Sequence, residues 1–260
     1  MAFAEDVRAD HGRCELVVNL AGVAATGAFE KTSLDEADRV ISVNLNGVMN
    51  VSRAFFPLLK ANPNSYLVNT TSALSSLFGP PGCTAHSASS FAVRGFTESL
   101  AIECAELNPN IHVSTAIIGL VKNEHLKHSQ PHLFDPELRL LGRSKMSEKI
   151  ETLDIKGLSR WVHLLSGTTS KDAAMQLVEG INQNYPKIFI GSDARMLDIF
   201  TRFFPLTWTR PWPFRFVLLL TLVLTRLVGR RIVMAFTLLL VYKFSDLIQM
   251  NLDSVMRLNF

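Results

Sequence analysis

Apolar and polar positions alternate along the chain in a way that predicts helices and strands in turn. Residues 1–10 form a polar, amphipathic stretch typical of a helix, and CELVVNL (14–20) has the unbroken apolar character of a buried strand. A helical stripe occupies 32–61, and either Thr32 or Ser33 is expected to cap its amino end. The run PNSYLVNTTS (63–72) predicts the next strand.

The same alternation continues toward residue 205. A third helix begins near His86, IHVSTAIIG (111–119) predicts a strand, SKDAAMQLVEGINQ (170–183) a helix, and PKIFIGS (186–192) a short strand. Strands separated by helical segments are typical of a parallel sheet with helices on both faces. The sequence therefore predicts an α/β protein.

Composition places the chain among globular proteins. Of its 260 residues, 48% are hydrophobic and 19% are charged, which suits one large domain or two small ones. The three cysteines, Cys14, Cys83 and Cys104, have no CxxC spacing, so we expect reduced thiols in a cytoplasmic protein rather than a disulfide framework or a zinc site. The opening stretch lacks the apolar core of a secretory signal.

The charge is unevenly distributed and divides the chain into two predicted domains, 1–205 and 206–260. Residues 1–205 contain 19 Lys and Arg against 21 Asp and Glu, whereas residues 206–260 contain 7 against 2. The basic excess therefore belongs to the second domain. Residues 1–205 show no basic stripe with interleaved aromatic residues, so we expect no nucleic-acid partner.

The second predicted domain is apolar as well as basic. Its two apolar runs, 216–225 and 232–242, are each shorter than the roughly 18 to 20 residues that span a bilayer. Read as one helix, the segment carries three arginines at its middle, so insertion across a membrane is marginal. Two interpretations stay open: a helix that contacts a membrane or partner through 214–243, and a core helix.

Four segments carry a family resemblance. VVNLAGV, VNLNGVMNVSRAFFPLL, LVNTTSALSSLFGPPG and SASSFAVRGFTESLAIE, in this order and at these separations, resemble the short-chain dehydrogenase/reductase family over about residues 1–205. The resemblance implies a Rossmann-type doubly wound sheet, here without its first strands. It also implies hydride transfer between NAD or NADP and an alcohol or carbonyl compound.

The resemblance assigns the family's catalytic positions one by one. The family uses an asparagine, a serine that polarises the substrate, a tyrosine as general acid/base, and a lysine that lowers the pKa of the phenol and binds the nicotinamide ribose. Asn44 matches the asparagine, and the serine position is either Ser72 or Ala73, depending on the end from which one counts. The tyrosine position is His86 and the lysine position is Ser90. We therefore expect impaired catalysis.

The cofactor site is also incomplete. The family's N-N-A-G appears as NLAG at 19–22 and its P-G loop as IG at 118–119, so the remnant cofactor positions are Asn19, Ala21, Gly22 and Gly119. The glycine-rich TGxxxGxG segment that holds the pyrophosphate does not occur in the sequence. We expect a domain truncated at its front, with doubtful NAD(P) binding and an exposed edge on strand 14–20 that a second copy or related subunit covers.

One weaker signal lies in EHLKHSQPH (124–132). Its acidic and imidazole side chains stand at spacings that a metal could use: Glu124, His125, His128 and His132. The resemblance places this segment at a substrate lid instead, so no metal site is predicted.

Three functions remain in competition after the sequence is read. The first is a catalytically impaired short-chain dehydrogenase/reductase. The second is an active NAD(P)-dependent oxidoreductase whose full chain is longer. The third is a non-catalytic module that binds a membrane or a related subunit.

Overall fold

The computed structural model describes residues 2–25, 27–80, 82–122 and 168–203, and its centre is a parallel sheet. The four strands are β1 (Leu16–Asn19), β2 (Ser65–Ser72), β3 (Ile111–Ile118) and β6 (Lys187–Ile190). They lie in the order β1-β2-β3-β6, and every neighbouring pair is parallel. The predicted strands at 14–20, 63–72, 111–119 and 186–192 are therefore confirmed, with β1 shorter than its apolar run.

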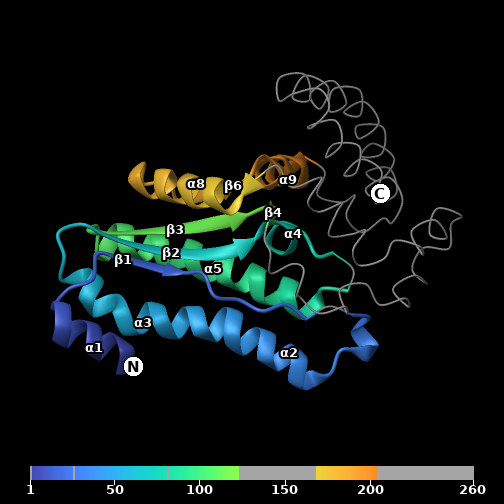
Figure 1. Ribbon diagram of the computed structural model, residues 1–260, viewed down its shortest axis with the longest axis horizontal. Helices are drawn as coiled ribbons and strands as arrows, with labels where there is room; N and C mark the ends of the chain where they lie inside the picture. Colours follow the sequence, from blue (N-terminus) through green and yellow to red (C-terminus); the bar gives the residue numbers. More distant parts are fainter. Residues whose placement is uncertain (1, 26, 81, 123–167, 204–260) are drawn as a thin grey trace, which may run out of the picture. The chain divides into compact units, whose positions relative to one another are not determined.

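Helices cover both faces of this sheet, as Figure 1 shows. One face carries α1 (Ala2–His11), α3 (Gly47–Lys60) and α5 (Thr84–Leu107), whose apolar side chains pack with Val17, Leu67 and Val113 of the strands. The other face carries α8 (Ser170–Asn182), which packs on Val68, Ala116, Ile188 and Ile190. Adjacent residues of β2 point to opposite faces, as the period of a strand requires. The α/β prediction, with a partial doubly wound sheet, is correct.

The predicted helical stripe at 32–61 is continuous but not uniform. It consists of α2 (Leu34–Ile41), a π-helical turn η2 (Ser42–Asn46) and α3. Ser33 is the cap, because its hydroxyl accepts the Glu36 N–H while the Glu36 carboxylate accepts the Ser33 N–H. This geometry decides between the two candidate caps.

Shorter elements complete the described part of the chain. They are η1 (Phe29–Lys31), α4 (Ala73–Ser76), β4 (Val121–Lys122), β5 (Thr168–Thr169) and α9 (Ser192–Phe203), and the sequence patterns predict none of them. β4 and β5 form a separate parallel pair. The described residues up to Thr201 belong to one compact unit. No helix in the described ranges is long and apolar enough to cross a membrane, and the predicted contact segment 214–243 lies outside them.

Candidate active site

The carboxyl ends of the parallel strands bring most of the predicted site positions to one edge of the sheet. Asn19 ends β1 and residues 20–22 follow it, Ser72 ends β2, and Gly119 follows β3. The first turn of α5 adds His86, because α5 begins at Thr84 after the loop that leaves β2 and α4. In open α/β sheets this edge is the usual place for a ligand.

Asn44 holds the segment after β1 in place. It lies in the π-helical turn and is 9% exposed. Its Oδ1 accepts the Val23 N–H at 2.8 Å, and its Nδ2 donates to the Val23 carbonyl at 2.8 Å and to the Ser89 hydroxyl at 3.1 Å. A Cβ on Gly22 would approach Asn44 Oδ1 to 3.4 Å, so glycine suits this close contact.

His86 lies against the same group of residues. Its Nδ1 is 3.5 Å from Asn44 Nδ2, and its carbonyl accepts the Ser89 hydroxyl at 2.9 Å. Burial lowers the pKa of His86 below its ordinary value, and a hydrogen bond between the ring and the backbone of Val23 only partly offsets this effect. The imidazole is therefore neutral near neutral pH, where it carries one N–H and one bare nitrogen.

Ser90 lies one turn further along α5 and is only 5% exposed. Its carbonyl accepts the Thr71 hydroxyl at 3.2 Å, which ties α5 to the end of β2. A hydroxyl in this position carries no charge, so it supplies neither the electrostatic effect nor the donor count of an ammonium group. His86 and Ser90 thus share one face of α5 as their spacing predicts.

The two candidates for the serine position differ in the structure. Ser72 is partly exposed at the end of β2, and its carbonyl accepts the Ser76 hydroxyl at 2.7 Å. Ala73 begins α4 and is fully buried. Of the two positions, only Ser72 offers a hydroxyl group at this edge of the sheet.

Asn19 has a different environment from the one that the family resemblance implies. Its Nδ2 donates to Asn69 Oδ1 at 2.8 Å and lies 3.3 Å from Ser52 Oγ, and Asn69 in turn donates to the Thr97 hydroxyl at 3.0 Å. These residues form a polar network between the sheet and the helices α3 and α5. Ala21 is exposed beyond the end of β1. The Asn19 side chain therefore stabilises the interior, where buried polar groups need partners.

Gly119 is packed against a residue that sequence reasoning missed. The Asp193 carboxylate, at the start of α9, accepts the Leu120 N–H at 2.6 Å and occupies the space where a Gly119 side chain would lie. A side chain on Gly191, whose φ is +91°, would meet the same carboxylate. Burial raises the pKa of Asp193, against the effect of hydrogen bonds from the backbone of Leu120 and Ala194. An acidic residue at the start of a helix can be recognised in the sequence, but the sequence does not show that Asp193 binds the Leu120 N–H.

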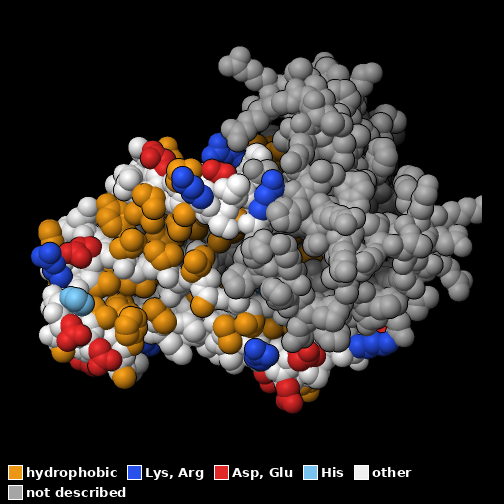
Figure 2. All heavy atoms as spheres, in the orientation of Figure 1, with side chains coloured by type: hydrophobic (Ala, Val, Ile, Leu, Met, Phe, Trp, Pro, Cys, Tyr) orange, Lys and Arg blue, Asp and Glu red, His pale blue; other side chains and the backbone are white. Residues whose placement is uncertain are grey.

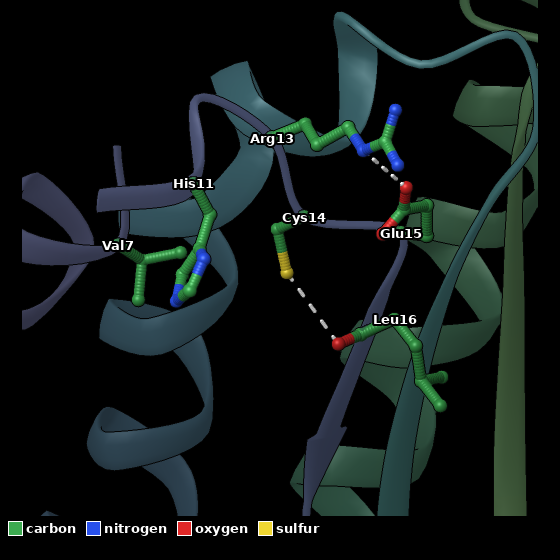
Figure 3. A pocket seen from close by; sticks show the side chains of 6 residues that line it. All are labelled: Val7, His11, Arg13, Cys14, Glu15 and Leu16. Atoms are coloured by element: carbon green, nitrogen blue, oxygen red, sulfur yellow. Dashed lines mark hydrogen bonds and ion pairs between the residues drawn. The ribbon is translucent and has the colours of Figure 1, made fainter. Parts of the chain in front are cut away.

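A groove lies at the opposite, amino end of β1. It has a volume of about 620 Å³ and is lined by Val7, His11, Arg13, Cys14, Glu15 and Leu16 (Figure 3). Arg13 Nε and Glu15 Oε1 pair at 2.8 Å, and the Cys14 thiol lies 3.5 Å from the Leu16 carbonyl oxygen. Burial raises the pKa of the Cys14 thiol, so it is not an activated nucleophile.

Metal binding finds no support in the described part of the chain. No group of three or more His, Cys, Asp or Glu side chains converges there. The segment that contains Glu124, His125, His128 and His132 lies outside the described residues.

Helices on both faces of a parallel sheet, with polar side chains gathered at the carboxyl ends of its strands, define the doubly wound class of α/β folds. Comparison with known proteins identifies the family within this fold class. The model of the short chain dehydrogenase family matches residues 1–133, and the chain belongs to that family. The expected family is thereby confirmed.

Several relatives show how much of the family's length the chain covers. SadH of Mycobacterium tuberculosis, a protein named as an oxidoreductase, is 29% identical over 205 residues, which are 78% of this chain and 67% of SadH. The oxidoreductase UcpA of Escherichia coli is 35% identical over 111 residues, 43% of this chain and 41% of UcpA. The chain thus spans about two thirds of one relative and less than half of the other.

A solved structure supports the fold. A short chain dehydrogenase/reductase from Burkholderia phymatum, in complex with NAD, matches 81% of this chain and 72% of its own with a TM-score of 0.63 and 24% identity. A short-chain dehydrogenase from Streptomyces avermitilis matches with a TM-score of 0.56 and 24% identity. At this identity the likeness establishes the fold and leaves the chemistry to be argued from the residues.

Proposed function

We propose that this member of the short chain dehydrogenase family is impaired in hydride transfer between a nicotinamide cofactor and alcohols or carbonyl compounds. The observation that carries the proposal is the pair His86 and Ser90 on α5. At the family's tyrosine position stands a neutral imidazole, and at its lysine position a hydroxyl that is 5% exposed. General acid catalysis by a phenol requires a cation that lowers its pKa, and neither group is present.

The described residues fit a nicotinamide dinucleotide poorly. The Asn19 side chain is engaged with Ser52 and Asn69, and the space beside Gly119 is filled by the Asp193 carboxylate. Ser90 offers no cation for the ribose hydroxyls. We therefore assign no step to a bound cofactor, and NAD or NADP remains the cofactor that family membership implies.

The competing proposal is an active NAD(P)-dependent oxidoreductase in which His86 replaces the tyrosine. It is supported by the 3.5 Å between His86 Nδ1 and Asn44 Nδ2, which joins the imidazole to the asparagine of the family's proton relay. A neutral imidazole carries one N–H that could serve as an acid. Ser90 stands against this proposal, because it cannot hold the ribose.

Calorimetric titration with NAD(H) and NADP(H), together with NADPH oxidation in the presence of small ketones, distinguishes the two proposals. We expect no saturable binding at micromolar concentrations and no turnover, either by the unaltered chain or by the variant with His86→Tyr and Ser90→Lys. A hydride donor must be bound before acid catalysis matters. Turnover by the unaltered chain that His86→Ala abolishes would establish the active enzyme instead.

We also propose that residues 214–243 contact a membrane surface. The support is the sequence alone: two apolar runs joined by RLVGRR, and a local excess of basic residues that suits anionic lipids.

A further inference from the structure

The side chain of His86 joins the start of α5 to two other parts of the chain. Its Nδ1 lies 3.5 Å from Asn44 Nδ2 in η2, and its ring bonds the backbone of Val23, which follows β1. Val23 lies beyond Asn19, the last residue of β1 that pairs with β2. Asn44 holds it instead, by accepting the Val23 N–H and donating to the Val23 carbonyl, both at 2.8 Å. The place of the segment 20–25 therefore depends on these two side chains.

The hydrogen bonds of this cluster suit a neutral imidazole. Asn44 Nδ2 carries two hydrogens, and its two closest acceptors, the Val23 carbonyl and the Ser89 hydroxyl, lie at 2.8 and 3.1 Å. The Ser89 hydroxyl in turn donates to the His86 carbonyl at 2.9 Å. The amide nitrogen beside the ring is thus a donor with both hydrogens engaged. An imidazolium would bring to this nitrogen a positive charge and a hydrogen on each ring nitrogen.

The segments around the ring offer no charge that compensates an imidazolium in the described part of the chain. Three nearby segments contain no Asp, Glu, Lys, Arg or His: 20–25, 42–46 and 72–76. Four charged residues lie on α2, all of them exposed: Asp35, Glu36, Asp38 and Arg39. Figure 2 shows acidic and basic side chains on the surface over α2. None of them alters the pKa of His86, which burial lowers and the bond to Val23 only partly restores.

The other elements that pack on α5 do not supply a partner either. The titratable side chains of β2 and β3, Tyr66 and His112, stack on each other on the face of the sheet that carries α8. On α5 itself, Arg94 pairs with Glu98 two turns further along. The Cys83 thiol, three residues before the imidazole, is neutral because burial raises its pKa. A positive charge on the ring therefore has to be hydrated.

We propose that protonation of His86 releases the segment 20–25 from the start of α5, so that the carboxyl end of β1 opens in acid. A charged ring is costly in this half-buried place, and it turns to water, where its charge is hydrated. Its bond to the backbone of Val23 is then lost, and Asn44 holds Val23 without it. Opening requires no cofactor, so this inference is independent of the proposed function.

The direction of the pH dependence follows from the lowered pKa of His86. The closed cluster binds a proton less readily than the open one, in which the ring is in water and has its ordinary pKa. Closure is therefore most stable above the ordinary pKa of a histidine, and it weakens as the pH falls from that value toward the lowered pKa. The full weakening equals the ratio of the two acid dissociation constants, about tenfold for each pH unit between them.

The first test uses the full, unaltered chain with isotope-labelled histidine and valine. NMR follows the titration of the His86 ring. Hydrogen exchange, corrected for its intrinsic dependence on pH, follows the protection of the Val23 amide, which donates to Asn44. We expect the ring to titrate below its ordinary pKa and the protection to fall with it. Constant protection across the titration, or a ring that titrates at or above the ordinary pKa, overturns the proposal.

The second test removes the titrating group. His86→Gln is neutral at every pH and can still bond the backbone of Val23, so the protection of the Val23 amide should no longer change between neutral and mildly acid pH. His112→Gln is the matched control and should keep the fall seen in the unaltered chain, because His112 stacks on Tyr66 on the other face of the sheet, with 5.2 Å between the ring centroids. An equal fall in His86→Gln shows that another group causes it and refutes the assignment. Circular dichroism verifies that both variants fold, and the first test needs no variant.

Discussion

Replacing Gly119 by alanine tests the contact between the end of β3 and α9. The new Cβ would contact both oxygens of the Asp193 carboxylate, at 2.5 Å from Oδ2, so the carboxylate must move and lose its 2.6 Å bond from the Leu120 N–H. A hydrogen bond to a charged group contributes about 1.5 to 3 kcal/mol, and overpacking costs about 1 to 3 kcal/mol. Alanine returns about 0.4 to 1 kcal/mol through the unfolded state. These contributions sum to a net loss of about 1.5 to 5.6 kcal/mol.

The free energies of unfolding in urea of Gly119→Ala, Asp193→Ala and the double variant test whether the contact with the carboxylate causes this loss. Asp193→Ala removes the same hydrogen bond, but it also makes room for the new Cβ, so the two effects should not add. We expect an interaction free energy beyond about 1 kcal/mol, well above the roughly 0.3 to 0.5 kcal/mol seen for independent sites. Additive losses would show that the carboxylate does not occupy the space beside Gly119.

Gly95→Ala is the matched control for this experiment. Gly95 is exposed in the middle of α5, and a Cβ there would have no atom within 4 Å. Alanine is favoured over glycine in a helix interior by about 0.8 to 1 kcal/mol, so this variant should be more stable than the unaltered chain. If Gly95→Ala instead lowered the free energy of unfolding, the loss in Gly119→Ala could not be assigned to its contact with Asp193.

Two further predictions concern an ion pair and the membrane. Burial raises the pKa of Glu98, but hydrogen bonds from Lys187 (2.8 Å) and Arg94 (2.9 Å) outweigh it and leave the pKa below its ordinary value. The two ion pairs therefore stabilise the folded state above the ordinary pKa of a glutamate, and this stabilisation is lost as the pH falls through the lowered pKa of Glu98. Glu98→Gln should thus reduce the free energy of unfolding by at most about 1 kcal/mol near neutral pH. In denaturation curves this difference should disappear at acid pH. For the membrane, the full chain should float with anionic liposomes and a chain ended at Pro205 should not; equal flotation would reject the proposed contact through 214–243.

The sequence was sufficient for the main elements because their apolar periods are long. The strands β2 and β3 and the helices α5 and α8 appear where the patterns predict them. The π-helical turn at Ser42–Asn46 was not predictable, since it changes the hydrogen bonding without interrupting the apolar stripe. The choice of Ser33 over Thr32 as the cap required the Glu36 geometry, because both residue types are good caps.

The site was harder to predict because its contacts join distant residues. The family positions predict that Asn44 and His86 lie at the same edge of the sheet. They do not predict that the two side chains approach to 3.5 Å. Asn19 could not be distinguished from a cofactor contact until its bonds to Ser52 and Asn69 were seen. Asp193 was missed because nothing near it in the sequence identifies Leu120, 73 positions away, as its partner.

The replacement at Ser90 affects stability as well as chemistry. A lysine there would place an ammonium group at a position that is 5% exposed, and a buried charge is costly unless it is paired and hydrogen-bonded. A bound ribose could meet that need in a member that holds a cofactor, and the cofactor would then stabilise the folded chain by mass action. Ser90 has no such requirement, because its hydroxyl carries no charge. An inactive variant carrying Ser90→Lys is therefore informative only if its free energy of unfolding shows that it is folded.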